Sequence, residues 1–300
     1  MSAVTVVILT LNEELHIKRC IESAKKISSD IVVIDSFSSD ATVAIAEQLG
    51  ARVMKNAWPG NQALQFNWAL SQLPKTTQWV MRIDADEYLT TELIDQINDR
   101  IPTVKSAVNG IFCKRSFGFQ GHLLKHGGAH AIQVLRLFRF GFGCSEVRWM
   151  DEHIEVQGTC IEFGGELIDD NLRPLKDWTD KHNQYSSREA VELLAWEYPA
   201  LLSKGIEKAA HQSQIGAKRW IKKNIYTKLP AGLRALAYFI YRYIFMLGFL
   251  DGKSGTHFHV LQAFWYRYLV DAKVDEVKRY MHAHHASINE AIKVVLGITV

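Results

Sequence analysis

The sequence predicts an α/β domain built on a parallel sheet, followed by a helical carboxyl-terminal region. Three observations indicate this arrangement. Short apolar, β-branched runs alternate with segments of helical spacing over roughly the first 90 residues. Polar clusters follow several of these runs, and the composition becomes basic and then aromatic from about Lys204. A chain of 300 residues is long enough for two domains, and we place their boundary between residues 203 and 204.

The expected elements of the first domain are justified by their apolar patterns. Val4–Leu9 is continuously apolar, which is typical of a strand buried on both faces, whereas Leu15–Ala24 has apolar residues at helical spacing. The same alternation continues along the chain, which predicts that the strands are parallel. The expected strands cover residues 4–9, 31–34, 52–54 and 79–83, and the expected helices cover 15–24, 40–49, 60–70 and a segment beginning near Thr90.

Composition and charge argue against several classes of protein. Hydrophobic residues make up 48% of the chain and charged residues 22%, which predicts a folded core. A net charge of +3 is too small to indicate a nucleic-acid partner. The four cysteines contain no C-x-x-C pair, so we expect no zinc site and reduced thiols. The first apolar run lacks a preceding basic region, so we interpret it as a strand of a cytoplasmic protein and not as a signal peptide.

Acidic and polar residues follow three of the predicted strands. Asn12–Glu14 follows the first strand, Asp35–Asp40 the second and Asp84–Glu87 the fourth. Because parallel strands present their carboxyl ends at one edge of the sheet, these clusters are expected to meet at a ligand site. Acids that merely precede a helix capped by Thr90 or Thr91 are the simpler alternative for the third cluster. Neither G-x-G-x-x-G nor a P-loop sequence occurs, so we expect a divalent cation, Mg²⁺ or Mn²⁺, to neutralise a diphosphate there.

The three clusters belong to longer motifs, which are VVILTLNEE at Val6–Glu14, VVIDSFSSDAT at Val32–Thr42 and RIDADEYL at Arg82–Leu89. In this order they resemble the motifs of inverting family 2 glycosyltransferases. Bacterial members that build lipopolysaccharide cores, capsules and exopolysaccharides also resemble the later stretches HGGAHAIQVLRLFR and VRWMDEHIEV. The resemblance implies a GT-A nucleotide-sugar-binding (Rossmann-like) sheet with a helical extension. It also implies transfer of a sugar from a nucleotide-diphosphate donor, for which we favour a uridine diphosphate sugar.

The resemblance further implies roles for individual residues. The loop after the first strand would hold the nucleoside, and Asp35 would accept a hydrogen bond from the base. In the D-x-D pair, Asp86 would bind the metal directly, and Asp84 would reach the ribose or the water ligands of the metal. The metal would stabilise the leaving nucleoside diphosphate by bridging its phosphates. The residues expected to bind the donor are Thr10, Leu11, Asn12, Glu13, Asp35, Arg82, Asp84 and Asp86.

An inverting transfer also needs one general base, which takes the proton of the acceptor hydroxyl. The resemblance places it in RWMDEHIE, where we favour Asp151 and take Glu152 as the second candidate. A solvated acidic loop is the simpler alternative. Arg136 in QVLRLF is expected to pair with Asp151 or Glu152, or to face phosphate. The polar residues 169–171 are expected on the acceptor side or as helix caps. The Q-x-x-R-W motif of processive members is incomplete, which favours transfer of a single sugar.

The carboxyl-terminal third combines a basic stretch with an aromatic one. Lys218–Lys228 is basic, and Leu233–Leu250 approaches the length of a membrane-spanning helix. Arg234 and Arg242 interrupt it, so we expect a helix that lies in the membrane interface with both cations extended to the headgroups. Packing as ordinary protein core is the alternative. We therefore expect a cytoplasmic protein that is peripheral at the inner leaflet, with a lipid-linked glycan or lipopolysaccharide as acceptor.

Two other functions are open at this point. A nucleotidyltransferase also uses an α/β sheet and metal-binding aspartates, but its first loop is normally rich in glycine and basic residues, whereas Leu11–Glu14 is acidic. A non-catalytic membrane scaffold with a glycosyltransferase-like fold would not need the intact D-x-D pair.

Overall fold

The computed structural model describes residues 3–147, 152–198, 230 and 232–299. The chain divides into unit 1, which comprises Met1–Glu146 and Glu152–Arg173, and unit 2, which comprises Val147–Asp151 and Pro174–Val300. The division near residue 173 lies well before the expected boundary at 203 and 204. The reason is that helix α5 (Leu175–Glu197) packs on helix α9 (Tyr266–His284) and shares an apolar core with it.

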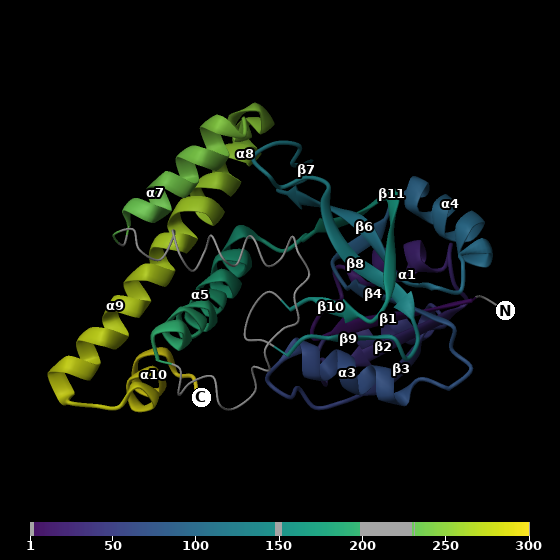
Figure 1. The fold of residues 1–300 in the computed structure, drawn as a ribbon, viewed down its shortest axis with the longest axis horizontal. Coiled ribbons are helices and arrows are strands. Elements are labelled where there is room, and N and C mark those ends of the chain that lie inside the picture. Colours follow the sequence, from purple (N-terminus) through teal and green to yellow (C-terminus); the bar gives the residue numbers. More distant parts are fainter. Residues whose placement is uncertain (1–2, 148–151, 199–229, 231, 300) are drawn as a thin grey trace. The chain divides into compact units, whose positions relative to one another are not determined.

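Unit 1 is built around a mixed sheet, whose strands lie in the order β3-β2-β1-β4-β8-β6-β11-β5, with β7 paired to β6 (Figure 1). The strands from β3 to β4 are parallel, as predicted. Beyond them the sheet is mixed, because β8 runs antiparallel to β4 and β6, and β5 runs antiparallel to β11. The strands are β1 (Val4–Thr10), β2 (Asp30–Asp35), β3 (Arg52–Lys55), β4 (Trp79–Asp84), β5 (Glu87–Leu89), β6 (Val108–Phe119), β7 (His122–Leu123), β8 (Ile132–Arg139) and β11 (Thr159–Asp170), and a separate ladder joins β9 (Gly143–Ser145) to β10 (Ile154–Val156).

The central strands are buried on both faces, which explains their uninterrupted apolar sequences. Val6 and Ile8 of β1 belong to a core cluster that includes residues of α1, α2 and α4. Val7, which points to the opposite face, belongs to a second cluster with Phe66 of α3. The helices of unit 1 are α1 (Ile17–Ala24), α2 (Thr42–Gln48), α3 (Gln62–Gln72) and α4 (Thr91–Arg100).

Side-chain caps set the starts of two of these helices. Helix α3 begins at Gln62, because Asn61 Oδ1 accepts a hydrogen bond from Leu64 N at 3.1 Å, and Gly60 has no side chain to do so. Of the two expected caps, Thr90 is the one that caps α4, since its hydroxyl accepts from Leu93 N at 3.4 Å.

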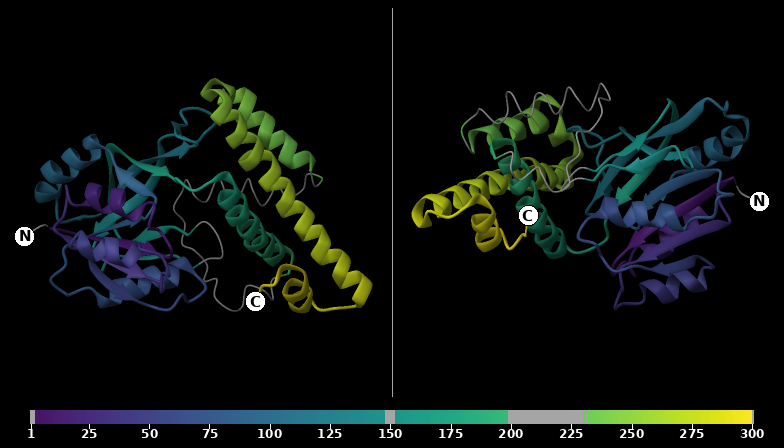
Figure 2. Two further views of the ribbon diagram at one scale, coloured as in Figure 1. Left: turned by 180° about the vertical axis from the view of Figure 1, so that it is seen from behind. Right: turned by 60° about the horizontal axis from the view of Figure 1, so that its bottom comes forward.

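Unit 2 is helical in its described part. Helices α5 and α9 lie side by side (Figures 1 and 2), and Tyr266 donates a hydrogen bond from its hydroxyl to Glu189 Oε2 at 2.8 Å between them. Taken alone, none of the described helices has both the length and the apolarity to cross a membrane, although Leu233–Phe245 and Gly248–His284 meet that criterion as a pair bent by 72°. The remaining elements are α7 (Leu233–Ile240), π-helical turn η4 (Tyr241–Phe245), 3₁₀ turn η5 (Gly248–Asp251), α8 (Gly252–Phe258), π-helical turn η6 (His259–Trp265) and α10 (Ile288–Leu296).

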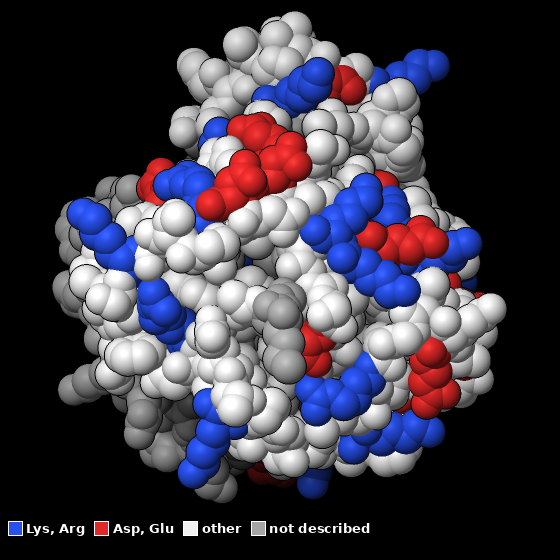
Figure 3. Space-filling view, turned by 90° about the vertical axis from the view of Figure 1, so that its right-hand side faces the viewer, with Lys and Arg blue, Asp and Glu red and all other residues white. Residues whose placement is uncertain are grey.

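Charged side chains of both signs are interspersed on the face of the molecule shown in Figure 3. Basic groups lie beside acidic ones on it, in keeping with the 35 basic and 32 acidic residues of the chain. The described residues of this face therefore form no continuous basic stripe of the kind that follows a nucleic-acid backbone.

Candidate active site

The three polar clusters meet at the carboxyl ends of the parallel strands, as predicted. In the register of the sheet, Thr10 of β1 lies beside Asp35 of β2, and Leu9 of β1 lies beside Asp84 of β4. Neighbouring strands are about 4.8 Å apart, so the segments that follow these ends are neighbours as well. This edge of the sheet is the candidate active site.

The loops after β1 and β2 are hydrogen-bonded to each other. Asn12 donates from its backbone N to Ser38 Oγ at 2.8 Å and accepts at Oδ1 from Ser39 N at 2.8 Å. Its φ of 57° is a left-handed value that asparagine tolerates better than most residues. Glu13 N donates to Thr42 Oγ1 at 2.7 Å. The predicted nucleoside loop is therefore fixed in position by the loop beside it.

The carboxylate of Asp35 is used within this loop pair. It is fully buried, with 0% exposure, and accepts from Thr10 Oγ1 at 3.1 Å and from Ser38 N at 2.8 Å. In this arrangement Asp35 organises the turn after β2, and a contact with the base stays a prediction. Leu11 and Phe37, by contrast, expose their apolar side chains at the tips of the two loops.

His16, which the sequence analysis did not single out, ties the first loop to the segment after β11. Leu172 N donates to His16 Nε2 at 2.9 Å, so Nε2 is the acceptor nitrogen and Nδ1 carries the hydrogen that faces Glu13 Oε2 at 2.6 Å. Arg173 Nη2 donates to the backbone carbonyl of Asn12 and lies 3.6 Å from Glu13 Oε2. The Glu13 carboxylate therefore has His16 and Arg173 as its neighbours within the protein.

The first acid of the D-x-D pair, Asp84, is neutralised by two arginines. Arg136 Nη2 donates to Asp84 Oδ2 at 2.9 Å, and Arg82 Nη2 donates to Asp84 Oδ1 at 3.4 Å. Burial alone would raise the pKa of Asp84, but the guanidinium groups of Arg136 and Arg82 outweigh it and hold that pKa well below its ordinary value. Asp84 therefore stays ionised, and each of its carboxylate oxygens already accepts a hydrogen bond from an arginine.

Arg136 is shared with a second, fully buried acid. Its Nη2 donates to Glu87 Oε1 at 2.5 Å, while Glu87 Oε2 accepts from Asp84 N at 3.0 Å. Burial and the nearby Asp84 carboxylate raise the pKa of Glu87 by more than Arg136 lowers it. The expectation that Arg136 pairs with Asp151 or Glu152 is not what the structure shows for the described residues. Strand β8 lies against β4, which places Arg136 beside the D-x-D strand instead.

The second acid, Asp86, has a different environment. Its Oδ2 accepts from the amide of Asn171 at 3.0 Å, and no ion pair to its carboxylate occurs within the described ranges. Asp169 lies on β11 opposite Glu87, where burial and the Asp86 carboxylate raise the pKa of Asp169 to about 8. Asp169 lies within β11 and does not cap α5, and its pairing with Glu87 places it beside the D-x-D pair. In the sequence, Asp169 was indicated only by its place in a pair of acids at the end of an alternating run.

These residues fit a divalent cation only if the donor supplies ligands. In the part of the chain that the structure describes, no group of three or more His, Cys, Asp and Glu residues could hold a metal ion alone. Mg²⁺ is commonly held by one or two carboxylates, substrate phosphates and water. Asp86 matches the protein share of such a site, whereas Asp84 already bonds two guanidinium groups.

Of the two candidate bases, Asp151 lies outside the described residues, and Glu152 lies at the start of a described segment. Glu152 precedes β10, in which Ile154 pairs with Ser145 of β9. Ser145 Oγ lies 3.5 Å from Nη1 of Arg82, the residue that bonds Asp84. This series of contacts connects the segment bearing Glu152 to the D-x-D strand.

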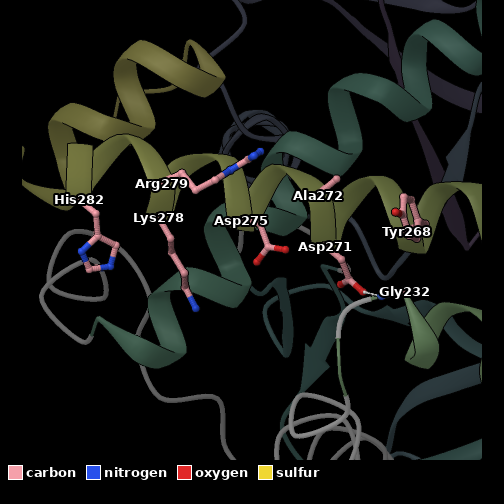
Figure 4. Close-up of a pocket in the computed structure, with 8 residues that line it drawn as sticks. All are labelled: Gly232, Tyr268, Asp271, Ala272, Asp275, Lys278, Arg279 and His282. Atoms are coloured by element: carbon pink, nitrogen blue, oxygen red, sulfur yellow. Dashed lines mark hydrogen bonds between the residues drawn. The ribbon is translucent and has the colours of Figure 1, made fainter. Parts of the chain in front are cut away.

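A cavity of about 500 Å³ lies in unit 2 on one side of α9 (Figure 4). Its described lining includes Asp271, Asp275, Lys278 and His282 of α9, with Gly232 at one end. The predicted site residues are not among these, so this cavity is not the site that the strand ends form.

Comparison with known proteins identifies the family. The model of glycosyl transferase family 2 matches residues 5–141. The lipopolysaccharide core biosynthesis glycosyltransferase LpsC of Rhizobium meliloti is 30% identical over 192 residues, which are 61% of this chain and 68% of the relative. An uncharacterized glycosyltransferase of Rickettsia felis is 44% identical over 97 residues, so the chain spans about a third of that relative, 33% of its length.

A solved structure supports the fold. The mannosyltransferase PcManGT from Pyrobaculum calidifontis, in complex with GDP-Man and Mn²⁺, is similar with a TM-score of 0.50 at 13% identity. The similarity covers 91% of this chain and 86% of that one, and at this identity it concerns the fold alone. The mixed sheet with a helical carboxyl-terminal region is the GT-A arrangement. The chain therefore belongs to glycosyltransferase family 2.

Proposed function

We propose that this enzyme transfers one sugar, with inversion, from a nucleotide-diphosphate sugar to a lipid-linked glycan or lipopolysaccharide acceptor. The observation that carries the proposal is the different environment of the two D-x-D acids. Asp84 is held by Arg136 and Arg82, whereas Asp86 bonds only a neutral amide among its described partners. One acid is therefore structural in its present contacts, and the other has negative charge to offer to a cation carried by a diphosphate.

The proposed donor site lies over the loops after β1 and β2, which are hydrogen-bonded to each other. Leu11 and Phe37 supply exposed apolar surface on which a nucleoside can pack, and the backbone around Asn12 is fixed by Ser38 and Ser39. Pre-organised loops of this kind reduce the entropy lost when the ligand binds. A uridine diphosphate sugar is the first donor to test, and the GDP-Man complex of the Pyrobaculum calidifontis mannosyltransferase makes a guanosine donor the second.

A divalent cation held by Asp86 would neutralise charge that develops on the leaving diphosphate. The chain itself contributes the position of that carboxylate, which Asn171 orients by its 3.0 Å hydrogen bond. It also contributes cations near the acids, since Arg136 and Arg82 keep Asp84 ionised. The Pyrobaculum calidifontis mannosyltransferase was solved with Mn²⁺, which supports testing that ion first.

The proposed base is Asp151 or Glu152, whose carboxylate would accept the proton of the acceptor hydroxyl during inversion. The contacts of Ser145 with Arg82 and of β9 with β10 support a base in this segment. The name of the Rhizobium meliloti relative supports an acceptor in lipopolysaccharide core assembly.

The test is hydrolysis of a panel of nucleotide sugars by the full chain with and without Mn²⁺. We expect slow release of nucleoside diphosphate from one donor class, dependent on the cation and faster when a lipid-linked or core oligosaccharide acceptor is present. Release of pyrophosphate from a nucleoside triphosphate and a sugar phosphate would instead identify a nucleotidyltransferase. Absence of nucleotide binding across the panel would favour a non-catalytic scaffold.

A further inference from the structure

The segment Leu233–Leu250 of unit 2 exposes an unusual amount of apolar surface. The described residues include 22 exposed large hydrophobic side chains, and ten of these lie in this short segment. Phe245 is 73% exposed, more than any other of them. Single exposed hydrophobic residues are ordinary, but a contiguous group of this kind marks an interaction surface. We call it the apolar tip surface, and its exposed members are Leu233, Leu236, Ile240, Tyr241, Ile244, Phe245, Met246, Leu247, Phe249 and Leu250.

The orientation of α7 explains why its large side chains face outward. Arg234 and Ala235 are buried, and Arg234 Nε donates to the Asp271 carboxylate of α9 at 2.8 Å. Gly232 N donates to Asp271 Oδ2 at 3.2 Å, which fixes the start of the helix against α9 (Figure 4). Leu236, Ile240 and Ile244 recur at helical spacing and remain exposed. The buried ion pair thus turns the apolar stripe away from the core of unit 2.

These contacts correct the expectation that Arg234 and Arg242 both extend away from the helix. Arg234 is 7% exposed and paired with Asp271. The guanidinium of Arg242 lies 5.7 Å from the ring centroid of Tyr238 and 5.8 Å from that of Phe258. Both cations are therefore held by partners inside unit 2, which leaves the exposed stripe apolar.

The tip is a tight reversal of the chain. Leu247 has a left-handed φ of 59°, and Gly248 lies so close to His259 that an added Cβ would meet the imidazole at 2.5 Å. Phe245, Phe249 and Leu250 flank this reversal with exposed side chains. The result is a compact apolar end at the bend between Leu233–Phe245 and Gly248–His284, which can insert into a lipid surface without crossing it.

We propose that the apolar tip surface docks on an anionic lipid bilayer. The sequence contains no Asp or Glu from Lys208 to Leu250, and besides the paired Arg234 and Arg242 it has six Lys or Arg residues between Lys208 and Lys228. Such a segment complements anionic headgroups by charge and acyl chains by its apolar side chains. A second copy of the chain is a poorer occupant, because it would bring two copies of this positive segment together. The proposal rests on unit 2 and does not depend on the identity of the sugar donor.

The test is co-sedimentation of the full chain with vesicles of phosphatidylcholine, with and without phosphatidylglycerol. We expect binding to the anionic vesicles that weakens at high salt. Phe245→Ser together with Leu250→Ser should weaken it by about tenfold or more, because both substitutions remove large apolar side chains from the contact with the acyl chains. Val294→Ser is the matched control, because Val294 of α10 is a comparably exposed hydrophobic residue outside the tip.

Three outcomes would overturn the proposal. Equal binding of the tip variant and wild type would show that other residues contact the bilayer. A failure of the wild-type chain to bind either vesicle would show that the surface has another occupant. A dimer in solution that the tip substitutions dissociate, without vesicle binding, would assign the surface to a second copy. Circular dichroism melts of the tip and control variants check that each chain is folded.

Discussion

The guanidinium of Arg136 lies 2.9 Å from the carboxylate of Asp84, on the neighbouring strand of the sheet. The same nitrogen lies 2.5 Å from Glu87, so one cation separates two acids that are close in sequence. Carboxylates this close would repel each other in a buried site. Arg136 therefore explains how an apolar strand can lead directly into a cluster of acids.

Replacing Arg136 with methionine should destabilise unit 1 by about 3–5 kcal/mol at neutral pH, because two buried carboxylates lose their cation. The pKa of Asp84 is depressed in the folded protein, so its stabilising contribution is present above the ordinary pKa and lost as pH falls through the folded value. Without Arg136 burial raises that pKa, so the deficit should shrink between pH 7.5 and pH 4.5, as the carboxylates protonate. Urea unfolding at both pH values measures it.

Arg139→Met is the control for this experiment. Arg139 lies on the same strand but donates to the backbone carbonyls of Val108 and Val104, at 2.8 and 3.3 Å. Its loss should cost the same free energy at both pH values. An Arg136→Met deficit that is equally independent of pH would contradict the assigned pairing.

Asp86→Asn should abolish the gain in nucleoside diphosphate affinity that Mn²⁺ provides, because the amide offers no charge to the cation. Since the described residues form no complete metal site, Mn²⁺ alone should bind the wild-type chain weakly, and calorimetry with and without nucleotide can compare the two. Asp95→Asn, on the exposed side of α4, is the control. Tight binding of Mn²⁺ without nucleotide, or an unchanged gain in Asp86→Asn, would contradict the assignment.

Asp151→Asn should lower the transfer rate by about 10²-fold or more while donor affinity stays unchanged, because the amide cannot accept the proton. Glu152→Gln should be the milder substitution. The reverse pattern would exchange the two roles. Full activity of both variants would remove this segment from the mechanism.

Phe37→Gly should weaken nucleotide binding without destabilising the fold. Phe37 has a left-handed φ of 63° and a 60% exposed ring, so its conformation is strained and its side chain packs little within the protein. Glycine relieves the strain, which offsets its greater freedom in the unfolded chain, so stability should change by less than about 1 kcal/mol. Phe142→Gly, another exposed phenylalanine of unit 1, should leave nucleotide affinity unchanged. Equal nucleotide affinity of Phe37→Gly and wild type would remove Phe37 from the donor site.

The predictable part of this protein is the part that local sequence patterns specify. Strands β1, β2 and β4 are short apolar runs that end in polar residues, and parallel pairing then requires those ends to meet. The partners of Arg136 could not be predicted from such local patterns. They depend on β8 pairing antiparallel with β4, with Leu137 beside Met81, and no local pattern specifies that register.

The same limit applies to the carboxyl-terminal region. The apolar run Leu233–Leu250 predicted one continuous helix with an apolar face. The apolar face is present, but the helical segment ends at Phe245 and the chain reverses at Leu247. Two arginines within an apolar run suggested cations directed to headgroups, but Arg234 finds Asp271 far along the chain on α9. A partner across two packed helices is a property of the tertiary structure, so charge counted along the sequence gave the wrong orientation for this side chain.

The last prediction concerns His259, whose two ring nitrogens are buried without a hydrogen-bond partner within the described ranges. Burial, aided by the charge of Arg242, lowers the pKa of His259 to about 4. The unfolded chain therefore binds a proton near pH 6.5 that the folded chain refuses, so stability falls as pH drops from about 6.5 towards 4 and is unaffected above it. Compared with wild type, His259→Phe should therefore raise the melting temperature of unit 2 more at pH 5 than at pH 8. His257→Phe, at an exposed position of α8, should show no such difference, and an equal pH dependence in wild type and His259→Phe would contradict a buried neutral imidazole.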